Sequence, residues 1–119
     1  MILVVDDAQP VRATIAQALV ELGFPVLEAE SGEAALDIIR EQRPMLVILD
    51  YVMPGMDGAE AARQIAAIDP DLPVIFSTGH APLRALRNGA GEELAVLHKP
   101  FTLAELDELI ASRLRLRTA

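Results

Sequence analysis

A chain of 119 residues, 52% of them hydrophobic, is long enough for one domain with a single sizeable core and too apolar to be disordered. The net charge of −8 argues against direct nucleic-acid binding, which needs a basic face, and the absence of cysteine excludes disulfides and thiolate metal sites. The first apolar run stops at Asp6, too early for a signal peptide, and no run reaches membrane-spanning length, so we expect a cytoplasmic protein.

The first part of the chain alternates short strands with amphipathic helices. After a strand over residues 2–5, apolar residues recur at helical spacing until Gly23 ends the helix. Residues 24–29 are predicted as a second strand, although a proline and glutamates interrupt the run. Ser31 is placed to cap a second helix, which ends before Pro44.

The middle of the chain repeats this order. Residues 45–49 are apolar throughout, as expected of a parallel strand that is covered on both faces. Asp57 and Glu60 have the spacing of a capping box that opens a third helix. A turn rich in proline and aspartate follows, and residues 74–78 form the fourth strand.

The last part is predicted to complete the alternation. Residues 82–88 give about two turns of helix before glycines break it, and residues 94–98 form the fifth strand. Residues 102–105 are a second capping box, which opens the final helix. Strand and helix thus alternate five times, which predicts one doubly wound α/β domain with a parallel sheet, right-handed crossovers and helices on both faces.

Four of the predicted strands end in residues that are able to do chemistry: Asp6 and Asp7, Asp50, Thr78 and Lys99. Because the carboxyl ends of parallel strands share one edge of the sheet, we expect these side chains to converge. Crowded carboxylates repel one another, and a hard divalent cation with oxygen ligands relieves that repulsion. The set, which includes the only lysine, therefore fits a divalent metal and a phosphoryl group.

Each of these residues has a simpler interpretation when it is taken alone. Aspartates commonly end strands or open turns in solvent, a lone threonine is usually a strand residue, and a lone lysine is usually solvated. The combination, not any single residue, favours a functional site. His98 interrupts an apolar strand, so we expect it in or beside the core.

In order and spacing, these motifs resemble a response-regulator receiver domain of two-component phosphorelay signalling. The resemblance rests on Asp6-Asp7, on Asp50 within Asp-Tyr-Val-Met-Pro-Gly-Met-Asp-Gly, on Ser-Thr-Gly at 77–79 and on Lys99-Pro-Phe, and it covers residues 1–119. It implies a flavodoxin-like sheet of strand order 2-1-3-4-5. It also implies a signalling switch that accepts a phosphoryl group from a histidine kinase or a histidine phosphotransfer protein, rather than an enzyme with an external substrate.

The resemblance implies a role for each residue of the site. Asp50 accepts the phosphoryl group. Mg²⁺ binds directly to Asp7 and Asp50, helped by the backbone carbonyl of Val52, while Asp6 holds a metal-bound water. Two side chains from the last two strands meet the phosphoryl oxygens, Thr78 by a hydrogen bond and Lys99 by its charge.

The sequence departs from the family pattern on one face. Receivers commonly carry Tyr or Phe three residues before the lysine of the fifth strand, as a switch side chain, and here that position is Val96. The predicted helix at 82–88 is also short. Both features lie where many receivers pass on their signal, so they concern the output and not the phosphorylation chemistry.

Three other classes of protein match the sequence less well. A haloacid-dehalogenase-type phosphatase or mutase needs a second aspartate two residues after the first, where this chain has Val52. A flavin-binding flavodoxin would want a glycine- and hydroxyl-rich phosphate loop after the first strand, whereas Asp6 and Asp7 would repel phosphate unless a metal is bound. A pseudo-receiver usually loses site residues, and this chain keeps all five.

The chain has no room for an effector domain, so we expect a stand-alone regulator or a receiver from a longer protein.

Overall fold

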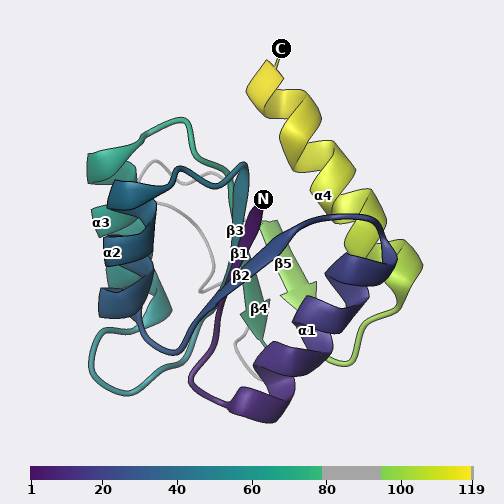
Figure 1. The fold of residues 1–119 in the computed structure, drawn as a ribbon, viewed down its shortest axis with the longest axis horizontal. Coiled ribbons are helices and arrows are strands. Elements are labelled where there is room, and N and C mark those ends of the chain that lie inside the picture. Colours follow the sequence, from purple (N-terminus) through teal and green to yellow (C-terminus); the bar gives the residue numbers. More distant parts are fainter. Residues whose placement is uncertain (79–94, 119) are drawn as a thin grey trace.

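A five-stranded parallel sheet forms the centre of the molecule (Figure 1). The computed structural model describes the backbone of residues 1–78 and 95–118 and the side chains of residues 1–78 and 96–114. The strands are β1 (Ile2–Val5), β2 (Val26–Ala29), β3 (Leu46–Asp50), β4 (Val74–Thr78) and β5 (Ala95–His98). Their order is β2-β1-β3-β4-β5, so the predicted 2-1-3-4-5 sheet is confirmed. All pairs are parallel, but the order in which successive strands join the sheet reverses between β1 and β3, the position where open α/β sheets bind ligands.

Helices cover both faces of this sheet, as the alternation predicted (Figure 1). The described helices are α1 (Gln9–Glu21), α2 (Gly32–Glu41), α3 (Gly58–Ile68) and α4 (Leu103–Thr118). In Figure 1, α2 and α3 lie on one side of the strands and α1 and α4 on the other. Within the described part of the chain, no helix is both long and apolar enough to cross a membrane.

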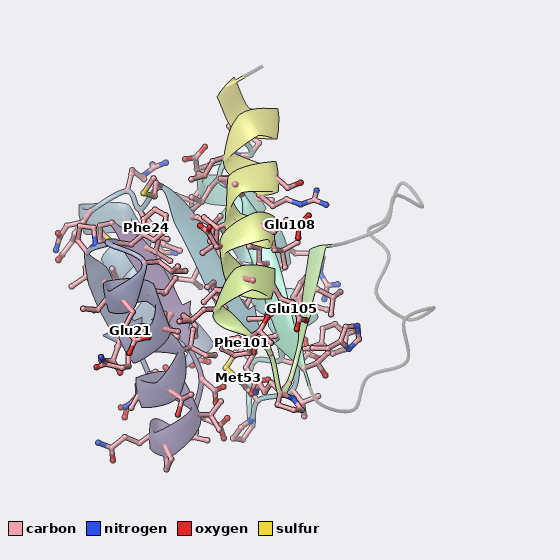
Figure 2. All side chains as sticks on the ribbon, turned by 90° about the vertical axis from the view of Figure 1, so that its right-hand side faces the viewer. Glu21, Phe24, Met53, Phe101, Glu105 and Glu108 are labelled. Atoms are coloured by element: carbon pink, nitrogen blue, oxygen red, sulfur yellow. The ribbon has the colours of Figure 1, made fainter. Side chains whose placement is uncertain are left out.

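Alternating strand side chains divide the core into two layers. Leu3 and Val5 of β1 pack with residues of α2 and α3, whereas Ile2 and Val4 pack with residues of α1 and α4. Phe101, which precedes α4, also packs on the second layer, while Glu105 and Glu108 of α4 lie on the exposed side (Figure 2). All residues of β1 and β3 are buried because helices cover both of their faces.

The helix ends follow the local sequence closely. The Ser31 hydroxyl accepts a hydrogen bond from the Ala34 amide at 3.1 Å, as a helix N-cap should. Asp57 caps α3 in the same way at 2.9 Å, and Thr102 accepts from the Glu105 amide at 3.1 Å. Each cap satisfies an amide that has no partner within its helix, so the three predicted helix starts are confirmed.

Some predicted boundaries and environments differ from the structure. The second strand begins at Val26 and not at residue 24, because Pro25 has no amide hydrogen to donate to the sheet. His98 is exposed, contrary to the expectation of a position in or beside the core. β5 is at the edge of the sheet, and the buried position belongs to the neighbouring Leu97. The helix predicted over residues 82–88 lies outside the described residues, as does residue 94 at the start of the predicted fifth strand.

Candidate functional site

Three carboxylates meet at the carboxyl edge of the sheet, beyond the ends of β1 and β3. One oxygen from each of Asp6, Asp7 and Asp50 lies within 4.8 Å of the others. Asp6 is 1% and Asp50 8% exposed, whereas Asp7 faces solvent. The parallel pairing of β1 with β3 brings these residues together although more than forty positions separate them in the chain. The carboxylates of Asp6 and Asp50 are therefore poorly solvated, whereas that of Asp7 is in contact with solvent.

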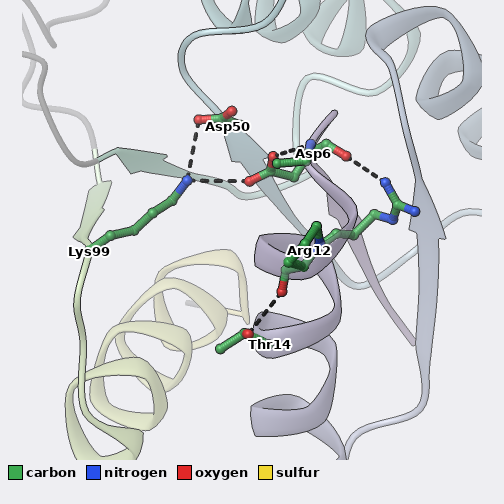
Figure 3. Close-up of polar contacts among 7 residues, drawn as sticks. Asp6, Arg12, Thr14, Asp50 and Lys99 are labelled. Carbon is green, nitrogen blue, oxygen red and sulfur yellow. Dashed lines mark hydrogen bonds and ion pairs between the residues drawn. The ribbon is translucent and has the colours of Figure 1, made fainter.

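Lys99 supplies the positive charge that partly balances this cluster. It follows β5, and its Nζ lies 3.3 Å from Asp6 Oδ2 and 3.6 Å from Asp50 Oδ1 (Figure 3). The Lys99 amide also donates to the Thr78 carbonyl at 3.0 Å, which fixes the start of the side chain to β4. The ammonium thus bridges two carboxylates from different strands.

The environment of Asp50 favours its neutral form. Burial is the main factor that raises the pKa of this carboxyl above its ordinary value, and the negative charge of Asp6 adds to it. The Lys99 charge and a hydrogen bond from the Val52 amide act in the opposite direction, and Asp7 has a smaller raising effect. Three carboxylates accompany a single ammonium, so the formal charge of the cluster is negative and a further cation would balance it.

The hydroxyl residues lie on the neighbouring strand. β4 pairs with β3 in a register that sets Ser77 opposite Asp50, and the Tyr51 amide donates to the Ser77 carbonyl at 3.1 Å. Thr78 is the next and last residue of β4 and is 2% exposed. The predicted Thr78 therefore lies at the same edge as the carboxylates, and its role toward a phosphoryl group stays a prediction.

Sequence reasoning did not identify Arg12, which braces the strand end that carries the acidic pair. Its Nη1 donates to the backbone carbonyl of Asp6 at 2.8 Å (Figure 3). Its Nε donates to Glu28 Oε1 on β2 at 3.0 Å. The Asp6 carboxylate is itself oriented by the Ala8 amide, which donates to Oδ1 at 2.9 Å. The available signal was a basic residue one turn into the helix that follows the acidic pair.

The donor set of this edge fits a hard divalent cation. Carboxylate oxygens are the ligands that Mg²⁺ prefers, and Mg²⁺ is usually held by one or two carboxylates while it keeps several waters. The grouping of Asp6, Asp7 and Asp50 is compatible with such a site, and the predicted roles of Asp7 and Asp50 as direct ligands and of Asp6 as partner of a bound water stay predictions. Val52 follows Asp50 by two residues in the β3–α3 connection, where its side chain is 64% exposed. Its carbonyl as a further ligand stays a prediction.

Val96, the position that departs from the receiver pattern, lies on β5 in register with Phe76. Its side chain is half-buried and helps to line a hollow with Glu105, Glu108 and Leu109 of α4. The departure is therefore on the α4 side of β5, away from the carboxylates. The residues between β4 and β5 lie outside the described part of the chain.

Comparison with known proteins gives a consistent result. The chain matches the model of the response regulator receiver domain over residues 2–111. It is 33% identical over 120 residues to sporulation initiation phosphotransferase F of Bacillus subtilis, with 98% of this chain and 95% of that protein covered. It is 38% identical over 107 residues to the response regulator receiver protein CpdR of Brucella abortus, with 88% of each chain covered.

A longer relative and two solved structures extend this result. The chain is 39% identical to the response regulator MprA of Mycolicibacterium vanbaalenii, with 98% of this chain covered but only 51% of that protein. A receiver-domain protein from Clostridium thermocellum superposes with a TM-score of 0.88 at 32% identity, covering 98% of this chain and 95% of that one. The receiver domain of NtrX from Brucella abortus gives 0.87 at 28% identity, covering 97% and 98%.

Proposed function

Because the chain belongs to the response regulator receiver domain family, we propose that it is a switch of two-component signalling that accepts a phosphoryl group on the Asp50 carboxylate. The observation that supports this most is the position of Asp50, buried, in contact with Lys99 and grouped with two further carboxylates. Receiver domains of response regulators receive their phosphoryl group from histidine kinases or phosphotransfer proteins, and we assign such a donor here. We also assign residues 1–119 to one receiver domain.

The proposed reaction is an in-line displacement. An Asp50 oxygen attacks phosphorus, the P–N bond to the donor histidine breaks, and an acyl phosphate forms while the departing imidazole retains the electron pair and takes up a proton. Lys99 is placed to stabilise negative charge that develops on the transferring oxygens, and Thr78 is proposed to donate a hydrogen bond to one of them. Mg²⁺ bound through Asp7, Asp50 and the Val52 carbonyl would screen the repulsion between the carboxylate and the incoming phosphoryl group.

Intact-mass spectrometry after incubation with Mg²⁺ and acetyl phosphate tests this assignment. The wild-type protein should gain one acid-labile phosphoryl group, and Asp50→Asn should gain none. Asp57→Asn is a matched control, because it removes a carboxylate from the same connection while asparagine still caps α3. Equal labelling of wild type and Asp50→Asn would overturn the assignment, and no labelling of any protein by either acetyl phosphate or kinases would favour a pseudo-receiver.

Metal binding is tested separately. Tyr51 is the only tyrosine, the chain has no tryptophan, and the Tyr51 ring packs edge-on against Phe76 with 5.4 Å between ring centroids. Its fluorescence should therefore report Mg²⁺ at the adjacent Asp50. The change in Tyr51 fluorescence should saturate as Mg²⁺ is added to the wild type and should be largely lost in Asp7→Ala. A titration curve of Asp7→Ala that equals that of the wild type would place the metal elsewhere.

The surface next to Lys99 is where we propose that the phosphodonor protein docks. A groove of about 760 Å³ lies between α1 and the start of α4, and its lining residues include Thr14, Ala18, Lys99, Phe101 and Leu103. A donor must bring its histidine to Asp50, so it must cover surface that adjoins the site. Leu103 is 42% exposed, and Leu103→Glu should slow transfer from a phosphorylated histidine kinase while leaving labelling by acetyl phosphate unchanged. Equal slowing by both donors would contradict docking in this groove.

A further inference from the structure

The N-terminus of α3 lies unusually close to the backbone that carries the phosphoacceptor. A Cβ atom on Gly58 would be 2.6 Å from the Asp50 carbonyl oxygen, 2.6 Å from the Tyr51 Cα and 2.9 Å from the Tyr51 carbonyl oxygen. The Gly58 amide donates to that same Tyr51 carbonyl at 2.9 Å. All three clashes are with backbone, which no side-chain rotation relieves, so only glycine allows this approach.

The segment that Gly58 touches leads directly into the site. The Val52 amide bonds the Asp50 carboxylate, and the Val52 carbonyl is the proposed third protein ligand. The opposite side of the segment is held by β4, because the Tyr51 amide donates to the Ser77 carbonyl and the Tyr51 ring packs against Phe76. A group added at position 58 would have to move either α3 or this segment, and moving the segment would disturb its contacts with β4.

We propose that Gly58 is a positioning residue for the metal and phosphoryl site. The missing side chain lets α3 press on the backbone of Asp50 and Tyr51, and this contact sets the direction of the Val52 amide and carbonyl. The proposal rests on the proposed function, since it concerns the same metal and the same acceptor. Gly58 itself touches neither the metal nor the phosphoryl group and acts through Val52.

The chain offers a matched control in Gly32. Gly32 and Gly58 are each the first residue of a helix and each follow a side-chain N-cap, so alanine changes helix propensity equally at both. A Cβ on Gly32 would lie 2.8 Å from Met56 Sδ, which is a flexible side chain and not backbone. The two variants therefore differ in what the new methyl group displaces.

Calorimetric Mg²⁺ titration of wild type, Gly58→Ala and Gly32→Ala tests the proposal, with Ile65→Val as a core variant of α3 that is remote from the site. Gly58→Ala should bind Mg²⁺ about tenfold more weakly or worse, the usual cost of disturbing groups that orient a ligand. Gly32→Ala and Ile65→Val should bind as the wild type does, whatever their thermal stability. Wild-type affinity in folded Gly58→Ala would overturn the inference, and equal weakening in Ile65→Val would reduce it to an effect of stability.

Hydrogen exchange of the wild-type protein keeps the inference testable if Gly58→Ala does not fold. Coupling between two sites is reciprocal, so Mg²⁺ should increase the protection of the Gly58 amide that is bonded to Tyr51. Unchanged protection at saturating Mg²⁺ would overturn the positioning role. If the wild type itself binds no Mg²⁺, the proposed function fails first, and the two failures are thereby distinguished.

Discussion

Replacing Lys99 by methionine removes the bridging charge and nearly preserves the length of the side chain. The ammonium is 3.3 Å from Asp6 Oδ2 and 3.6 Å from Asp50 Oδ1, and the Lys99 side chain is only 25% exposed. At an effective dielectric constant of about 20, each of these attractions is worth roughly 5 kcal/mol before desolvation is counted. Desolvation of the three groups offsets most of that sum.

The net effect should be a loss of about 2 kcal/mol in the free energy of unfolding at pH 7, in low salt and without divalent cations. This is below the roughly 3–5 kcal/mol typical of breaking a buried pair, because Lys99 is partly solvated. For a domain of this size the unfolding midpoint should fall by about 8 °C. Thermal unfolding followed by circular dichroism measures this shift.

Adding Mg²⁺ should reverse which of the two proteins, wild type or Lys99→Met, is the more stable. The ammonium and the metal compete for the same carboxylates, so Lys99→Met should bind Mg²⁺ more tightly than the wild type and recover stability as Mg²⁺ is added. Arg63→Met, which removes an exposed ion pair with Glu60 on α3, is a control that should change neither quantity appreciably. An Lys99→Met protein that is as stable as the wild type without metal, or that binds Mg²⁺ more weakly, would refute this reasoning.

Four further variants test the electrostatics and hydrogen bonding of the same edge. Without divalent cations, Asp50→Asn should raise the unfolding midpoint at pH 7 but not at pH 3. Burial and the Asp6 charge raise the pKa of Asp50 above its ordinary value of 3.8, so the native state binds a proton at Asp50 more tightly than the unfolded chain does. The native state therefore loses stability as the pH rises from 3.8 through the raised pKa. Equal unfolding midpoints of the two proteins at pH 7 would contradict this reasoning. Ser77→Ala should cost less than about 0.5 kcal/mol in urea unfolding, because the buried Ser77 hydroxyl has no hydrogen-bond partner among the described residues, and a loss above 1 kcal/mol would reveal a partner. By the same measurement, Arg12→Gln should lower the free energy of unfolding by about 2 kcal/mol. Glu28→Gln should lower it clearly less, because the Arg12 guanidinium would still donate to the Asp6 carbonyl. Equal losses would assign the effect to the Arg12–Glu28 ion pair alone.

Local sequence was sufficient for the elements and for the kind of chemistry. Apolar periodicity identified every described strand and helix, and Ser31, Asp57 and Thr102 marked three helix starts, because a cap needs only residues that are near in sequence. The site residues were predicted from their places at strand ends, because parallel strands bring those ends to one edge. The predicted ends of the strands were less exact, as the start of β2 after Pro25 shows. The exposure of His98 was missed because it depends on which strand lies at the edge of the sheet.

Only the tertiary structure decided how the residues at that edge contact one another. The length of Lys99 does not reveal that its ammonium reaches both Asp6 and Asp50, and nothing in the sequence pairs Arg12 with the Asp6 carbonyl and Glu28. Gly58 appears in the sequence as an ordinary residue after a cap, yet its lack of a side chain is required by backbone seven and eight residues earlier. These contacts join separate elements, so their distances depend on how strands and helices pack, and packing at close range is a property of the whole fold.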